Sequence, residues 1–349
     1  MIPGRANDAS AAAGMLACMS DLRISFTAQH EVSLLDDGRI PEIPAGGVRI
    51  RNRCTAISPG TELACLAGLE SAWFTFPTVP GYCAAGVIEA VADGVTGWAV
   101  GDRVLHYGGH RLWQTAVPGR DFLCRIPEGV PLEQAPFARM ATIAMTALRQ
   151  SSIELGDDVA VTGLGMIGNL AAQLAGLQGA QVAAFDIDRS RVDLAVGCGI
   201  AGAVVGGISR QANGARGYST LIEATGRAAS IVEALPHMAH AGEVLLLGTP
   251  RAAHDCDLAA VLRHFHLANT ALVLKPAHEW IRPVEAIPFT KHSFARDSRI
   301  ALELIASDRL HIAPLITHRL RPAEAPAVYR DLAAGRPGYA GVVIDWQAL

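Results

Sequence analysis

The pattern of hydrophobic and polar positions along the chain changes near Pro136. Before this point, short apolar or alternating runs are separated by turns that contain glycine and proline, a pattern typical of β-strands. From Asp158 onward, apolar runs of strand length alternate with segments of helical periodicity. Such alternation indicates a parallel sheet with helices on both faces. The sequence therefore predicts a β-rich part, then an α/β part, and a return to strand-like segments near the end of the chain.

These runs predict the individual elements. In the β-rich part we expect strands at 22–26, 48–54, 86–90 and 103–105, and in the returning segment strands at 316–319 and 340–346. In the α/β part we expect strands at 158–163, 181–186, 202–205, 219–224, 243–248 and 270–275. Helices are expected at 136–150, 169–177, 294–307 and 322–334. We accordingly predict a disordered N-terminal extension at 1–20, a β-rich domain at 21–141 and 309–349, and an α/β domain at 142–308.

Three glycines lie between the first predicted α/β strand and the helix that follows it. Gly163, Gly165 and Gly168 have the spacing G-x-G-x-x-G. In a dinucleotide-binding turn, the first glycine permits the tight turn, the second lets the pyrophosphate approach the backbone, and the third lets helix and strand pack closely. The N–H groups at the start of the helix, around Met166 and Ile167, then point at the phosphates. The pattern predicts dinucleotide binding in this domain.

Asp186 ends the next predicted strand. A carboxylate at this place accepts hydrogen bonds from the adenosine ribose and repels the 2′-phosphate of NADP, so we expect NAD in preference to NADP. Arg191 follows closely in the sequence, and an arginine there can accommodate that phosphate, which keeps NADP as the alternative.

Composition narrows the functional classes. The formal net charge is −4 and no long basic run is present, so we expect no nucleic-acid partner. The most apolar region, 159–185, is interrupted by glycines and amides, so we expect no membrane span despite a mean hydropathy of +0.27. The seven cysteines are scattered, odd in number and without metal-ligand spacing, which fits reduced thiols in a cytoplasmic protein better than a disulfide framework.

Several segments resemble the medium-chain dehydrogenase/reductase family. The resemblance extends from Asp21 onward and implies an α/β fold, a Rossmann doubly wound parallel sheet plus a β-rich GroES-like catalytic domain. The segments that correspond to the family's V-P-G-H-E-x-x-G, its G-D-R-V strand, its D/E-x-x-G and its C-terminal return are 79–86, 94–104, 221–226, 315–319 and 341–345. The resemblance also implies that the nicotinamide end of the coenzyme meets Thr225, Gly248, Thr249 and Pro276.

The departures from the family pattern concern zinc. Members with catalytic zinc bind it through a cysteine, the histidine of G-H-E and a later cysteine or acid, and those places here hold Ser58, Tyr82 and a residue near Ala138. These residues cannot supply the ligands that zinc needs, and the family's four-cysteine lobe is missing. The chain therefore resembles the zinc-independent branch, which includes quinone and enoyl reductases, and we expect no metal. A weaker resemblance, through 57–62 and 79–82, is to bacteriochlorophyllide dehydrogenase-like members.

Two hydroxyls are candidates for the chemistry that zinc would otherwise perform. Tyr82 takes the place of the zinc-binding histidine, so its phenol either points at the nicotinamide or fills the vacated space. Thr61 matches the family's serine or threonine that bonds the substrate oxygen, and its alternative is a turn hydroxyl after Pro59 and Gly60. The acid beside it, Glu62, is expected to support the site by bonding nearby backbone or an arginine.

Other side chains are weaker candidates. His106 and His110 follow the G-D-R-V strand, and either is a proton shuttle or a hydrogen-bonded core residue. Because Gly108 and Gly109 argue against a helix, their spacing does not predict a metal site. The predicted substrate contacts are Ser58, Arg139, His278 and Trp280, each with a structural alternative as a buried turn, a helix face or a loop surface.

Together these features predict a zinc-independent NAD(P)-dependent oxidoreductase acting on a small molecule. The preferred reaction is reversible oxidation of a secondary alcohol on a cyclic or functionalised compound, with a general acid or base in place of zinc. The alternatives are reduction of a conjugated C=C bond, and a nucleotide-binding protein without net redox turnover. A homodimer or homotetramer is expected.

Overall fold

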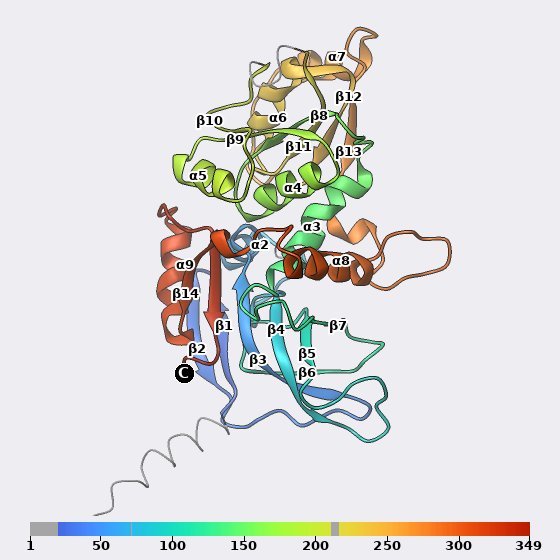
Figure 1. Ribbon diagram of the computed structural model, residues 1–349. Coiled ribbons are helices and arrows are strands. Elements are labelled where there is room, and N and C mark those ends of the chain that lie inside the picture. The colour runs from blue at the N-terminus through green and yellow to red at the C-terminus, as the bar shows by residue number, and fades with distance from the viewer. Residues whose placement is uncertain (1–19, 71, 211–215) are drawn as a thin grey trace, which may run out of the picture. The chain divides into compact units, whose positions relative to one another are not determined.

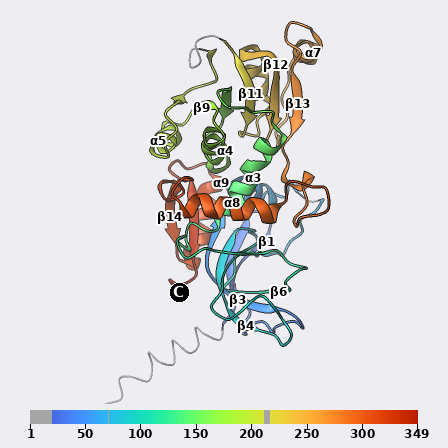
Figure 2. The same cartoon turned by 45° about the vertical axis from the view of Figure 1, so that its right-hand side comes forward.

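The computed structural model describes residues 20–70, 72–210 and 216–349, so the predicted extension lies almost wholly outside the described residues. The chain divides into two compact units (Figure 1). Unit 1 comprises Met1–Pro136 and His318–Leu349, and unit 2 comprises Phe137–Thr317. These limits differ from the predicted boundaries 141/142 and 308/309 by five and nine residues. The first moves because helix α3 (Phe137–Gln150) packs along its length against helices α4 (Met166–Leu177) and α8 (Phe294–Ala306) of unit 2 (Figure 2).

Unit 1 is built mainly of β-strands. Strands β1 (Leu22–Ala28) and β2 (Glu31–Asp36) form an antiparallel pair. A second sheet has the order β14-β15-β3-β4-β5-β7, and β6 also pairs with β3. Its strands are β3 (Val48–Ile57), β4 (Ala84–Val91), β5 (Arg103–His106), β6 (Trp113–Ala116), β7 (Leu123–Arg125), β14 (Ile316–Leu320) and β15 (Gly341–Asp345), and the unit's helices are α2 (Pro59–Leu66) and α9 (Ala325–Ala333). Strands β2, β6 and β7 were not predicted.

The C-terminal segment completes the core of unit 1. Strand β15 pairs antiparallel with β3, with Val343 opposite Ala56. The side chain of Trp346 is fully buried, and Tyr329 from α9 packs edge-on against Phe26 at 5.1 Å. The return predicted from the sequence is therefore confirmed, and it brings residues from both ends of the chain into one core.

Unit 2 contains a six-stranded parallel sheet of order β10-β9-β8-β11-β12-β13. Its strands are β8 (Asp158–Thr162), β9 (Gln181–Asp186), β10 (Ala203–Val205), β11 (Tyr218–Glu223), β12 (Met238–Leu246) and β13 (Val273–Pro276), close to the predicted positions. The remaining helices are α5 (Arg189–Gly197), α6 (Ala228–Ala234) and α7 (Leu258–His266). Because crossovers are right-handed, the connections of β8 to β10 and of β11 to β13 cover opposite faces. The order reverses between β8 and β11, which is where such sheets bind ligands.

One sequence expectation is corrected by the elements. The expected turn at Pro59–Gly60 is wrong, because Pro59 opens helix α2. Proline suits the first helical position, where its fixed φ matches the helix and its missing N–H would have no partner. Within the described ranges, no helix combines the length and the apolar character that crossing a bilayer requires.

Candidate functional site

The glycine turn of unit 2 has the geometry that a dinucleotide needs. Gly163 has φ +87° and lies so close to the loop after β11 that an added Cβ would be 2.8 Å from Thr225 Cγ2. A Cβ at Gly168 would be 1.8 Å from the carbonyl oxygen of Gly163, so only glycine permits this packing of helix on turn. Gly165 is the N-cap of α4, and a Cβ there would meet nothing within 4 Å. The turn therefore leaves open space at the helix N-terminus, which fits a bound pyrophosphate.

Asp186, which is predicted to bond the adenosine ribose, also holds nearby backbone. Its Oδ2 accepts a hydrogen bond from the backbone N–H of Leu164 at 2.7 Å, and its Oδ1 accepts one from the N–H of Asp188 at 2.9 Å. The carboxylate thus ties the glycine turn to the end of β9. Arg191 Nη1 lies 3.6 Å from Asp186 Oδ2, so the two residues whose charges set the expected coenzyme preference are paired.

The loops after β11 and β12 meet at the same edge of the sheet. A Cβ at Gly248 would be 2.3 Å from the backbone nitrogen of Gly226, so the two loops touch through their backbones. The buried Glu223 holds its loop, because its carboxylate accepts the N–H and O–H of Thr225 and the N–H of Gly226. Burial raises the pKa of Glu223 above its ordinary value. Sequence analysis gave this residue no task of its own.

The positions predicted for the nicotinamide end share that edge. Thr225 and Thr249 are exposed, and Pro276 ends β13. Because β8, β11, β12 and β13 run parallel, their carboxyl ends and these residues lie on the side of the sheet that carries the glycine turn. This arrangement supports the predicted coenzyme contacts without testing them.

Unit 1 brings three hydroxyl groups together, which we call the hydroxyl cluster: Ser58, Thr61 and Tyr82. The Tyr82 phenol donates to Ser58 Oγ at 2.5 Å, and Thr61 Oγ1 lies 3.5 Å from the same phenol oxygen. Ser58 precedes α2 and Thr61 lies in its first turn, whereas Tyr82 comes from the segment before β4. Burial raises the pKa of Tyr82 well above its ordinary value, so the phenol stays protonated and acts as a hydrogen-bond donor at neutral pH.

The donor atoms of this cluster do not fit a catalytic zinc ion. Zinc sites in proteins use thiolate, imidazole and carboxylate ligands, and Ser58 and Tyr82 offer a hydroxyl and a phenol that bond one another. In the part of the chain that the structure describes, no group of three or more histidine, cysteine, aspartate or glutamate residues is arranged to hold a metal ion. We therefore derive no step through zinc.

The two candidate histidines are both buried in unit 1. For His106, the N–H of Gly108 donates to Nδ1 at 3.0 Å, so Nε2 carries the proton and bonds Asn52 Oδ1 at 2.7 Å. Burial lowers the pKa of His106 to about 4. With both nitrogens engaged and no charge near neutral pH, His106 is suited to holding β5 on β3 rather than to shuttling protons. His110 is fully buried beside Glu62, with 3.1 Å between Nε2 and Oε2.

The predicted substrate contacts of unit 2 have partners of their own. Arg139 is buried in an ion pair with Glu279, and its guanidinium lies 5.3 Å from the ring of Phe294. Arg139 is therefore not the solvated residue on a helix face that was its alternative, because its side chain is buried and paired. Its role as a substrate contact stays a prediction. His278 caps a short 3₁₀ helix, Glu279–Ile281, and Trp280 in that helix is 59% exposed. Both stay predictions as substrate contacts.

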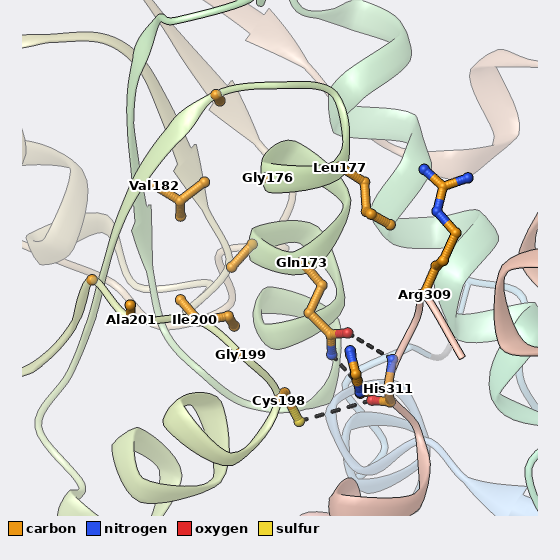
Figure 3. A pocket seen from close by; sticks show the side chains of 13 residues that line it. Gln173, Gly176, Leu177, Val182, Cys198, Gly199, Ile200, Ala201, Arg309 and His311 are labelled. Atoms are coloured by element: carbon orange, nitrogen blue, oxygen red, sulfur yellow. Dashed lines mark hydrogen bonds between the residues drawn. The ribbon is translucent and has the colours of Figure 1, made fainter. Parts of the chain in front are cut away.

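A cavity of about 410 Å³ lies elsewhere in unit 2 (Figure 3). It opens beside the C-terminal half of α4 and the start of β9, the opposite edge of the sheet from the glycine turn. Gln173 and His311 line the cavity. The Gln173 amide donates to the carbonyl oxygen of His311 at 3.1 Å and accepts from the His311 N–H at 2.8 Å. Cys198 Sγ lies 3.8 Å from the same carbonyl. These bonds fasten the segment around His311 to α4, and the cavity is separate from the predicted coenzyme site.

Sequence comparison shows similarity to known dehydrogenases. The family model of the alcohol dehydrogenase GroES-like domain matches residues 44–129. L-threonine 3-dehydrogenase of Streptomyces coelicolor is 26% identical, over 88% of this chain and 94% of the relative. D-guloside 3-dehydrogenase of Shigella flexneri is 29% identical, over 72% of each chain.

Solved structures share the fold. An alcohol dehydrogenase from Escherichia coli CFT073 in complex with NADH has a TM-score of 0.76 at 19% identity, over 93% of this chain and 99% of that chain. A structure described as that of a zinc-binding dehydrogenase from Sinorhizobium meliloti 1021 bound to NADP has a TM-score of 0.73 at 20% identity, with the same coverage. The domain match, the dehydrogenase names of the relatives and the shared fold agree with the resemblance to medium-chain dehydrogenases/reductases that the sequence motifs indicated.

Proposed function

We propose that this protein is a zinc-independent, NAD(H)-preferring oxidoreductase that interconverts a secondary alcohol and a ketone on a cyclic or functionalised small molecule. The observation that carries the proposal is the hydroxyl cluster, in which the Tyr82 phenol lies 2.5 Å from Ser58 Oγ. The family resemblance implies that these two residues take the places of zinc ligands in zinc-dependent members. The glycine turn supports the coenzyme half of the proposal. The dehydrogenase names of the relatives support the reaction class.

Each unit supplies one part of the chemistry. When bound to unit 2, a nicotinamide coenzyme would supply or accept the hydride. In the reductive direction, negative charge grows on the substrate oxygen, and a neutral O–H donor stabilises that charge more in the transition state than in the ground state. Tyr82 is such a donor, and Ser58 and Thr61 lie near enough to orient its O–H. In the oxidative direction the same hydroxyls would bond the alcohol oxygen and relay its proton from one hydroxyl to the next, and the proton would be released to solvent water.

Removal of metal is expected to leave activity unchanged. The hydroxyl cluster contains no ligand of the type that zinc prefers, so treatment with a chelator has nothing at this site to extract. Elemental analysis of protein purified without added metal, together with turnover before and after chelation, checks this. Stoichiometric zinc that is lost together with activity would contradict the proposal.

A substrate panel is expected to separate the possible reactions. Secondary alcohols with NAD⁺, and the matching ketones with NADH, should turn over, because the cluster offers a donor to a single oxygen. Conjugated enones and quinones with NADH form the comparison arm. Turnover confined to that arm would favour C=C reduction. NADH binding without turnover of any compound would favour a nucleotide-binding role.

A further inference from the structure

We propose that Glu62 and His110 are positioning residues, a buried pair that holds the hydroxyl cluster in its working geometry. Glu62 fixes Ser58, and His110 fixes the backbone beside Tyr82. The inference rests on the function proposed above, in which the cluster bonds the substrate oxygen. Neither residue needs to touch the substrate for this task.

Glu62 holds the start of helix α2. Its Oε1 accepts a hydrogen bond from the backbone N–H of Ser58 at 2.7 Å. Its Oε2 accepts the hydroxyl of Tyr329 and lies 3.1 Å from His110 Nε2. Only 3% of the side chain surface is exposed, so a shift of the carboxylate cannot be compensated by water. The position of Ser58, and with it the acceptor for the Tyr82 phenol, is therefore tied to the carboxylate of Glu62.

His110 is held from both sides of its ring. Trp346 Nε1 donates to Thr55 Oγ1 at 3.0 Å, and Thr55 Oγ1 lies 2.8 Å from His110 Nδ1. The assignment that uses every donor has Thr55 donating to Nδ1 and His110 Nε2–H donating to Glu62. The imidazole is thereby fixed in orientation between β3 and α2.

The imidazole is packed against the residue that precedes Tyr82. Gly81 has φ +95°, and a Cβ added there would lie 2.7 Å from His110 Nε2. The Cα of Gly81 thus rests on the ring with no room for a side chain. Gly81 and Tyr82 share a peptide bond. The ring of His110 therefore fixes the backbone position from which the Tyr82 side chain extends. The pair therefore controls both partners of the 2.5 Å contact between Tyr82 and Ser58.

The test uses His110→Leu in the full-length protein. This change removes both hydrogen bonds and the flat ring below Gly81. Since misplacement of a reacting group by about 1 Å costs up to roughly 10²-fold in rate, we expect kcat to fall about 10- to 100-fold. NADH affinity should stay unchanged, because the glycine turn belongs to unit 2.

A second readout does not depend on turnover. The chain has five tyrosines, so protein labelled with 3-fluorotyrosine gives a simple ¹⁹F spectrum in which the Tyr82 signal is the one lost in Tyr82→Phe. We expect that signal to shift or broaden in His110→Leu. Glu62→Gln is the milder second variant, because its amide oxygen still accepts from Ser58 while its NH₂ faces His110 Nε2–H and cannot accept from it. The same change of the Tyr82 signal is expected there.

Tyr329→Phe is the matched control. It removes another buried hydrogen bond to Glu62 Oε2 but leaves Ser58, Gly81 and His110 in place. We expect a lower melting temperature with parent-like kcat and an unmoved Tyr82 signal. The proposal is overturned if His110→Leu or Glu62→Gln folds and keeps both the kcat and the Tyr82 signal of the parent. It is also overturned if Tyr329→Phe changes kcat and the Tyr82 signal as much as those variants do. If Tyr82→Phe itself turns over normally, the proposed function fails, and the Tyr82 signal still decides the positioning role.

Discussion

Replacement of Tyr82 by phenylalanine is expected to lower kcat about 10²- to 10³-fold, the loss that follows removal of one donor from an oxyanion-binding site. The change keeps the ring and removes only the hydroxyl, which now bonds Ser58 at 2.5 Å. Packing is therefore preserved while donation is lost. Steady-state kinetics with NADH and a ketone substrate, together with a coenzyme titration, measure the effect.

The affinity of Tyr82→Phe for NADH should stay near that of the parent, because the predicted contacts of the coenzyme lie in unit 2. Thr61→Val is the companion variant, since it keeps the shape of a side chain 3.5 Å from the phenol and removes its hydroxyl. A smaller loss is expected there. If both variants turn over within a few-fold of the parent, the hydroxyl cluster does not assist hydride transfer, and the proposed reaction loses its proton donor.

The coenzyme turn was the part of the site most open to prediction from sequence. Gly163, Gly165 and Gly168 lie within one short segment, and their spacing alone predicts the turn. Only Gly168 is crowded by a near neighbour in the chain, because a Cβ there would lie 1.8 Å from the carbonyl oxygen of Gly163. What the sequence could not show is that Gly163 is also crowded by Thr225, because that contact depends on β8 and β11 being neighbours in the sheet. The parallel strands were predicted, whereas their order follows from the fold.

The catalytic half was less open to prediction. The family resemblance indicated Tyr82 and Thr61, but Glu62 accepts a hydrogen bond from Tyr329, 267 positions away, and no local pattern predicts that contact. His106 and His110 were weighed as proton shuttles because both follow the same strand. Their burial and their hydrogen-bond partners favour a structural role for both histidines, and these features arise from sheet register and from the return of the C-terminal strand. Those are properties of the packed unit rather than of the residues around each histidine.

Asp186→Ala is expected to weaken NADH binding roughly 10- to 100-fold. Hydrogen bonds to a charged group contribute about 1.5–3 kcal/mol each, and 1.4 kcal/mol corresponds to a factor of ten in affinity. The carboxylate is expected to bond the ribose, and it also holds the N–H of Leu164 in the glycine turn at 2.7 Å. Asp186→Asn is the matched control, since its amide oxygen can keep one backbone bond while the charge is lost. Titration of NADH should rank the parent first, Asp186→Asn second and Asp186→Ala last.

Asp186→Ala is also expected to change the selectivity between NADH and NADPH, because of Arg191. That guanidinium lies 3.6 Å from an oxygen of Asp186 and 3.9 Å from one of Asp188, so in the parent its charge is already opposed by two carboxylates. Loss of Asp186 removes the repulsion of a 2′-phosphate and frees Arg191 to bind it, so affinity for NADPH should rise relative to NADH. Adding Arg191→Ala should abolish that relative gain. Tighter binding of NADPH than of NADH by the parent protein would show that Asp186 does not set the preference, and the charge pair would then act only to hold the turn.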